Sequence, residues 1–206
     1  MPVSQRTRLL PFCRRPAGDK YELLFQDSRE IEDPQGRGRL TLYRIRAVRA
    51  IRDVVRRGDL GGYVQSLDNL SHAGNCWVAD RACILGNARI WGDAWVGGAA
   101  TVCDQAWVFE RAVVCGQAVV AGSARVFGQA QVYGRSYVGG HVLVAGQAVV
   151  SGQAHAMGCC WVGGQARLDH DAWLSGNQII TEAPSGCLWP SGCREIPGPR
   201  VLSERA

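Results

Sequence analysis

The chain has 206 residues, a mass of 22.3 kDa and a net charge of +5, a size that allows one or two domains with a sizeable core. No apolar run approaches ~20 residues. Residues 1–15 hold no apolar stretch before a small-residue cleavage site, so we expect a cytoplasmic protein that does not bind a membrane. Nine cysteines, an odd number without a secretion signal, indicate free thiols rather than a disulfide framework.

Residues 1–70 are interpreted as an N-terminal capping segment. Lys20–Leu24 and Gly38–Ala47 are candidate strands, and the turn-forming residues 33–36 between them predict a β-hairpin. All of the net charge lies in this segment, since it carries fourteen Lys and Arg against nine Asp and Glu. After the hairpin, apolar residues have the spacing of a helix and predict a short one: Val48, Ile51, Val54 and Val55.

Residues 71–180 repeat every six residues without an insertion. Seventeen of the eighteen positions reached in steps of six from Val78 to Ile180 are Val, Ile or Leu, and the exception is Ala156. A small residue, usually Ala, lies two residues before each aliphatic, and Gly usually lies two residues after it. Self-similarity at a fixed period is typical of a solenoid, and a six-residue period indicates a parallel β-helix.

The six-residue unit has a direct physical interpretation. The small residue and the aliphatic alternate with outward-facing residues, as in a short strand with one buried face. The next Gly and polar residue form a corner, because Gly adopts backbone angles closed to other residues and short polar side chains tolerate tight bends. Three strands and three corners make a triangular coil of eighteen residues, so the repeats predict about six coils. Val142, at a position that elsewhere holds Ala, shares a coil with Ala156, and we interpret the pair as volume compensation in one core layer.

The repeat resembles the hexapeptide-repeat, left-handed parallel β-helix superfamily, whose motif is an aliphatic residue with small residues at fixed offsets. Left-handedness is implied by this resemblance alone, because the general rule for parallel crossovers predicts the opposite hand. The resemblance implies an all-β fold, a single-stranded left-handed parallel β-helix, to which the hairpin predicted from residues 20–47 adds a small N-terminal cap. Four upstream stretches are similar to the lead-in of uncharacterised bacterial and phage-encoded hexapeptide-repeat proteins: Tyr43–Ala47, Gly58–Val64, Asn69–Ser71 and Gly74–Val78.

Residues 181–206 lose the period and form a Pro/Gly-rich C-terminal tail with four prolines and three glycines. Leu188 and Trp189 are adjacent bulky apolar residues in this tail. We expect them to cover the last coil, because a solenoid otherwise exposes its core and open backbone groups at its end.

One outward face of the predicted coils is rich in aromatic and arginine side chains. Residues eighteen apart stack on such coils, so Trp91, Phe109 and Phe127 are expected to form a ladder. An aromatic patch of this size exceeds the few hundred Å² that monomers normally leave exposed. We therefore expect it to be covered by another copy of the chain, by the chain's own N-terminal segment or tail, or by a foreign partner. The predicted interface residues are Arg89, Trp91, Trp107, Phe109, Arg125, Phe127, Leu143 and Trp161.

An enzymatic alternative comes from the resemblance, because many superfamily members are trimeric acyltransferases that use acetyl-CoA or acyl-CoA. In those enzymes a histidine between subunits is the general base, a role that suits its near-neutral pKa. His155 is the candidate here, since it points outward from a strand between Tyr137 and Trp173. No Asp or Glu lies next to it on its ladder, and the repeats contain no long loop for an acceptor pocket. His170 lies between two aspartates, but consecutive strand residues alternate in direction, so we expect no metal site there.

Two other site classes have structural explanations. No two cysteines have C-x-x-C spacing, so the cysteines, of which Cys83 and Cys103 point outward, are not expected to bind zinc. Arginines between Arg44 and Arg57 form a basic stripe that could contact phosphates. Acidic residues interrupt the stripe, so a solvated face is favoured and nucleic acid is not an expected partner.

The sequence therefore favours a non-catalytic β-solenoid scaffold that needs no cofactor or metal. It is expected to self-associate as a trimer or dimer, or to bind a protein partner, through the flat aromatic face. The alternative is an acyltransferase with acetyl-CoA or acyl-CoA as its cofactor.

Overall fold

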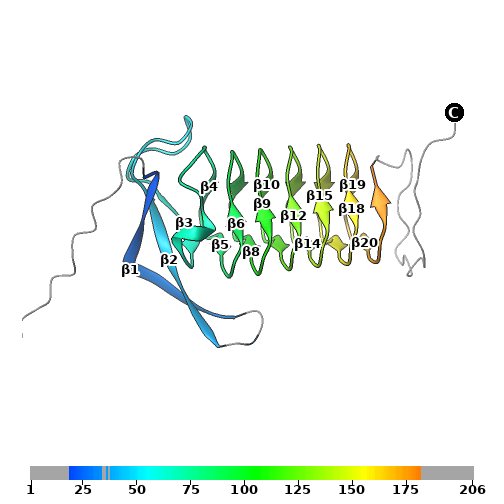
Figure 1. The fold of residues 1–206 in the computed structure, drawn as a ribbon, viewed down its shortest axis with the longest axis horizontal. Helices are drawn as coiled ribbons and strands as arrows, with labels where there is room; N and C mark the ends of the chain where they lie inside the picture. The colour runs from blue at the N-terminus through cyan, green and yellow to red at the C-terminus, as the bar shows by residue number, and fades with distance from the viewer. Residues whose placement is uncertain (1–18, 34–35, 37, 182–206) are drawn as a thin grey trace, which may run out of the picture.

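The computed structural model describes residues 19–33, 36 and 38–181, which form an all-β parallel solenoid of about seven turns. Figure 1 shows the coils stacked along one axis, with an antiparallel hairpin lying at an angle to them at the N-terminal end. Within these ranges the chain has no α-helix and only a single 3-10 turn, η1 (Leu67–Asn69). The all-β solenoid predicted from the six-residue period is confirmed.

Three sheets run along the solenoid, and their order shows which strands stack on one another. The first sheet joins the hairpin to the solenoid and contains, in spatial order, β1 (Tyr21–Glu32), β2 (Arg39–Ala47), β3 (Leu60–Val64), β5 (Cys83–Ile84), β8 (Thr101–Val102), β11 (Val119–Val120), β14 (Tyr137–Val138), β17 (His155–Ala156) and β20 (Trp173–Leu174). The second contains β4 (Trp77–Val78), β7 (Trp95–Val96), β10 (Val113–Val114), β13 (Gln131–Val132), β16 (Val149–Val150) and β19 (Arg167–Leu168). The third contains β6 (Arg89–Ile90), β9 (Trp107–Val108), β12 (Arg125–Val126), β15 (Leu143–Val144), β18 (Trp161–Val162) and β21 (Ile179–Ile180).

The strands of the solenoid pair in parallel with a register of eighteen residues. Val114 pairs with Val96 of one neighbouring coil and with Val132 of the other. The backbone N–H of Val113 donates to the carbonyl oxygen of Ala130 at 2.9 Å, and the same pattern recurs along the stack. Because the register matches three repeats, every inward position lies directly above an inward position, as the sequence predicted.

The core is one continuous cluster of the aliphatic and small residues that alternate along the repeats. Nearly all of them have no exposed surface, so the burial of apolar area along the whole axis is the main stabilising contribution. Val142 and Ala156 are both fully buried in this cluster. Their volume compensation remains a prediction.

Glycines occupy most corners because the backbone there has a positive φ and the corners of successive coils lie close together. Gly116, for example, has a φ of 74°. A Cβ atom at this position would lie 2.8 Å from the carbonyl oxygen of Gly134 in the next coil. Both the backbone angle and the spacing therefore favour Gly over a residue with a side chain.

The predicted N-terminal hairpin is confirmed and is longer than expected. β1 and β2 pair antiparallel from Tyr21 opposite Ala47 to Glu32 opposite Arg39, with an irregularity between Leu24 and Ser28. β2 pairs antiparallel with β3, and β3 pairs in parallel with β5. The hairpin therefore covers the edge of the first sheet, and β3 adds a strand ahead of the predicted coils.

The prediction of a short helix between residues 48 and 55 is wrong. Ile51 and Val55 form a tight antiparallel bridge with reciprocal backbone hydrogen bonds of 2.9 and 3.2 Å. Between them Arg52 has a φ of 49°, outside the helical region. Ile51 and Val55 are buried while Val54 is exposed, because a short segment does not offset the cost of helix nucleation and instead bends to place two side chains in the core.

The tail expected to cover the last coil, including Leu188 and Trp189, lies outside the described residues except for Thr181. In the described part of the chain, no helix has the length and apolar character needed to span a bilayer.

Candidate interaction surface

The predicted aromatic ladder is present on the outside of the third sheet. Trp91, Phe109 and Phe127 each follow the inward aliphatic of β6, β9 or β12, so the chain alternation directs their rings away from the core. The rings of Trp91 and Phe109 stack with centroids 4.6 Å apart and planes 9° apart. Phe109 and Phe127 stack at 5.0 Å and 5°. The eighteen-residue register produces this alignment.

A second column of side chains stands beside the ladder, on the strand positions that precede the aliphatics. The ring of Trp107 meets Trp91 edge-on, with centroids 5.2 Å apart. The guanidinium of Arg125 lies over the Trp107 ring at 4.6 Å from its centroid, a cation–π contact. Arg89 is exposed and Leu143 is half-buried in the same column. We call these five side chains, together with Phe109, Phe127 and Trp161, the aromatic face.

The rings of the aromatic face cover one another more than the sequence indicated. Trp91, Trp107, Phe109 and Phe127 are all half-buried, since each ring lies against a neighbour. Trp161, which continues the Trp107 column, is 45% exposed, and it lies over Gly163, where an added Cβ would meet its ring. The three stacked rings and the edge-on ring of Trp107 therefore shield one another partly from water, and Trp161 is the most exposed aromatic side chain beside them.

The N-terminal hairpin packs on a different face of the solenoid. Its Leu42 is fully buried against Cys83, Leu85, Cys103 and Ala121, which belong to or follow strands of the first sheet. Ile31 and Leu40 of the hairpin add to this second apolar cluster. The described part of the hairpin thus covers the outside of β5, β8 and β11, whereas the ladder lies outside β6, β9 and β12.

The outward cysteines of the first sheet are buried by the hairpin, which the sequence did not indicate. Cys83 and Cys103 are 7% and 3% exposed. Burial raises the pKa of both thiols, and that of Cys103 reaches about 12 because the carboxylate of Asp104 adds to the effect. A thiol with a raised pKa is a poor nucleophile, so these cysteines fill space between hairpin and coil.

Three carboxylates bridge successive coils at corners where most repeats have Gly. Asp80, Asp104 and Glu110 have positive φ values of 55°, 61° and 59°. Each accepts a hydrogen bond from the backbone N–H of the Gly eighteen residues later, at distances of 2.8 to 2.9 Å. The absence of Gly from these corner positions was the sequence signal for this arrangement. The bridges explain these acidic residues without a metal or a ligand.

The His155 ring lies between Tyr137 and Trp173, as the register predicted. The ring centroids are 5.9 Å and 4.9 Å away, and both pairs are stacked. Among the described residues neither ring nitrogen of His155 has a hydrogen-bond partner or a carboxylate within ion-pair distance. His170 is exposed, and its Nδ1 lies 3.1 Å from Oδ1 of Asp169. The geometry therefore gives His155 no orienting group of the kind that a general base needs, whereas the ring of His170 is paired with Asp169 and is 85% exposed.

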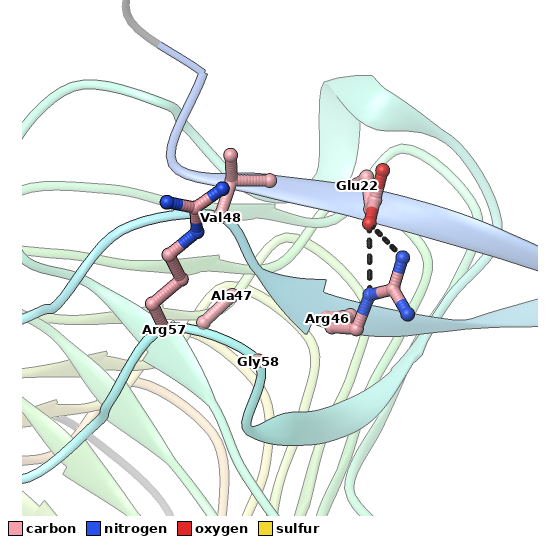
Figure 2. A pocket seen from close by; sticks show the side chains of 6 residues that line it. All are labelled: Glu22, Arg46, Ala47, Val48, Arg57 and Gly58. Carbon is pink, nitrogen blue, oxygen red and sulfur yellow. Dashed lines mark hydrogen bonds and ion pairs between the residues drawn. The ribbon is translucent and has the colours of Figure 1, made fainter.

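Two arginines of β2 pair with nearby groups. Arg46 donates two hydrogen bonds to Oε1 of Glu22, and Arg44 donates to the carbonyl oxygen of Gly61 at 3.1 Å. A hollow of about 310 Å³ lies beside the Glu22–Arg46 pair. Figure 2 shows Arg57 next to Val48, across from this pair. A carboxylate shares this hollow, and the helix expected to carry part of the basic stripe is absent. That nucleic acid is not a partner stays a prediction.

A buried polar cluster that the sequence did not indicate joins the start of the hairpin to the first coil. Lys20, just before β1, is fully buried, and its Nζ donates to Sγ of Cys76 at 3.0 Å. The backbone N–H of Lys20 donates to Nδ1 of His72, whose ring stacks on Tyr21 at 4.3 Å. The Tyr21 hydroxyl donates to the carbonyl oxygen of Leu70 at 2.7 Å. One signal was available, since Lys20 is the only lysine in a chain with twenty-two arginines.

In the described part of the chain, no group of three or more His, Cys, Asp or Glu side chains is arranged to hold a metal ion. A scan against models of protein families finds no match for this chain, and a search of curated proteins also finds none.

Proposed function

We propose that this chain is a non-catalytic scaffold of the hexapeptide-repeat, left-handed parallel β-helix type. It associates through the aromatic face with further copies of itself, as a trimer or dimer, or with a protein partner. The observation that supports the proposal is the position of the hairpin, which in the described part of the chain packs on the first sheet and not on the aromatic face.

The chemistry of the face suits a protein surface. The face combines stacked aromatic rings with an arginine that lies over a tryptophan. Tryptophan and arginine are among the residue types that contribute most binding energy at the centres of protein interfaces. The rings project from paired strands, so little conformational entropy is lost when a partner covers them. A flat, repetitive face also fits a second copy of the same solenoid, because coils of equal pitch place matching side chains at equal spacing.

Light scattering of a double variant, Trp91→Glu with Phe127→Glu, tests the proposal. The wild-type mass is expected to be a multiple of the 22.3 kDa chain, and the variant is expected to fall toward a single chain while keeping its circular dichroism. The matched control is Gln131→Glu with Arg167→Glu, which places two carboxylates at exposed strand positions of the second sheet. A wild type and double variant of equal mass and equal protease resistance would contradict a buried aromatic face.

The acyltransferase alternative makes a separate prediction. An enzyme that uses His155 as its base would release free CoA thiol from acetyl-CoA in the presence of an amine or sugar acceptor, and His155→Ala would abolish the release. We expect no turnover in either form, because the described surroundings of His155 are aromatic and hold no orienting carboxylate.

A further inference from the structure

Lys20 and Cys76 form a buried amine–thiol pair at the junction of the hairpin and the first coil. Their Nζ and Sγ atoms are 3.0 Å apart, and neither residue has exposed surface. The pair joins positions separated by 56 residues, since Lys20 precedes β1 and Cys76 precedes β4. The contact therefore links the hairpin to the solenoid.

The surroundings of the pair favour an uncharged amine. Burial lowers the pKa of Lys20, although the neighbouring Cys76 opposes this effect. In the described part of the chain, no carboxylate lies within ion-pair distance of Nζ, and Sγ is its only hydrogen-bond acceptor. A buried lysine without a carboxylate partner holds its proton weakly, and a neutral amine has the lone pair that a nucleophile needs.

Among the described residues, Nζ of Lys20 is the atom nearest to the Cys76 sulfur that could form a covalent bond with it. Besides Nζ, the Sγ atom of Cys76 contacts backbone carbonyl oxygens of Ser71, Ala73 and Ile90, at 3.5 to 3.9 Å. Carbonyl oxygens do not condense with an oxidised sulfur. The six cysteines of the described residues are all free thiols, so no disulfide competes at Cys76 in this part of the chain.

We propose that Lys20 and Cys76 are a modification site, at which a peroxide oxidant couples Nζ to Sγ through a sulfenamide bond and locks the hairpin onto the solenoid. In the first step the Cys76 sulfur attacks hydrogen peroxide. The O–O bond breaks, an S–O bond forms and one water leaves, so the sulfur is oxidised to a sulfenic acid while the peroxide is reduced.

In the second step the lone pair of Nζ attacks the sulfenic sulfur. An N–S bond forms, the S–O bond breaks, and the hydroxyl leaves as water with a proton from the nitrogen. The sum is one amine, one thiol and one peroxide giving one sulfenamide and two waters. An added thiol reverses the reaction by attacking the sulfur and releasing the amine. Peroxide enters when the hairpin edge opens locally, so coupling is slower than oxidation of the exposed Cys159.

The test is peptide mass spectrometry of the full chain after treatment with hydrogen peroxide, in a Cys159→Ser background. We expect the tryptic peptide with Lys20 to be joined to the peptide with Cys76, with the loss of two hydrogen atoms and of cleavage after Lys20. Because the chain has one lysine, the assignment of the amine is unambiguous. Dithiothreitol is expected to separate the peptides, and the coupled form is expected to melt on the order of 10 °C higher, as a cross-link closing a long loop does.

Two variants keep the proposal falsifiable. Cys76→Ala places at this position the residue that most repeats use, so it should fold and lose both the cross-link and the rise in melting temperature. Lys20→Met keeps an apolar stem but removes the amine, and dimedone should then trap a sulfenic acid at Cys76 that it does not trap in the wild type. The proposal is overturned if peroxide leaves Lys20 and Cys76 in separate peptides in the wild type, or if dimedone labels Cys76 equally with and without the amine.

Discussion

The first and third sheets are built from the same repeat, but their outer faces carry side chains of very different size. Outside β5 and β8 the chain presents the small side chains of Cys83 and Cys103, and the hairpin lies directly on them. Outside β6, β9 and β12 it presents large rings that stack on one another at the spacing of the coils. In both places the inward residues are Val, Ile and Ala of the same repeat.

The comparison shows that the size of the outward residues selects what a face can pack against. Small side chains let the hairpin approach the coils closely, and Leu42 of the hairpin is fully buried there. That face is therefore part of the chain's own apolar core. Large rings keep another backbone at a distance, and they bury part of their own surface by packing against one another. One face is therefore closed by the hairpin, while the described residues leave the other half-buried.

The largest expected effect comes from the core that both faces share. Val126→Asp places a charge without a partner at a fully buried position of β12, so we expect the chain not to fold. Circular dichroism and denaturant melts measure this. The control is Gln131→Asp, at an exposed position of β13, which should keep near-normal stability. If Val126→Asp melts like the control, the inward register is wrong.

An intermediate effect is expected on the hairpin face alone. Leu42→Asp removes a buried side chain and adds a charge between hairpin and coil, so the hairpin should open more readily, by about 2 to 5 kcal/mol. Limited proteolysis should then cut between residues 21 and 47 while the coils keep their circular dichroism. Thr41→Asp, exposed on the same strand, should resist cleavage like the wild type. Equal cleavage of both variants would show that Leu42 does not hold the hairpin.

The smallest effect is expected on the aromatic face. Phe109→Ala removes the middle ring of the ladder and both of its stacking contacts, which should lower the free energy of unfolding by about 1 to 3 kcal/mol. Urea melts measure the loss. Trp161→Ala removes a larger ring that has no stacked aromatic neighbour among the described residues and should cost less. A greater loss at Trp161 would mean that exposure to a partner, rather than stacking within the chain, stabilises this face.

The interior of the solenoid was predictable because it depends on a local rule repeated along the chain. Each unit places one aliphatic and one small residue inward, and the absence of insertions fixes the eighteen-residue register that brings Trp91, Phe109 and Phe127 together. The hairpin was predictable for a similar reason, since its strands are joined by a short turn in which the N–H of Gly36 donates to the carbonyl oxygen of Asp33 at 2.8 Å.

The remaining features depend on contacts between residues far apart in sequence. The helix predicted near Val54 does not form, because burying Ile51 and Val55 in the core stabilises the chain more than the weak helix propensity of this short segment does. The burial of Cys103 depends on where the hairpin lies, and the pairing of Lys20 with Cys76 depends on how the chain enters the first coil.

The sequence by itself determined the solenoid, its register and the ladder of rings, because a six-residue period acts between chain neighbours and between adjacent coils. Only the tertiary structure decided which face the hairpin covers and which buried groups meet beneath it. The angle at which a hairpin leaves a solenoid is set by the shape and volume of side chains on both surfaces, and no periodic pattern in the chain encodes that fit.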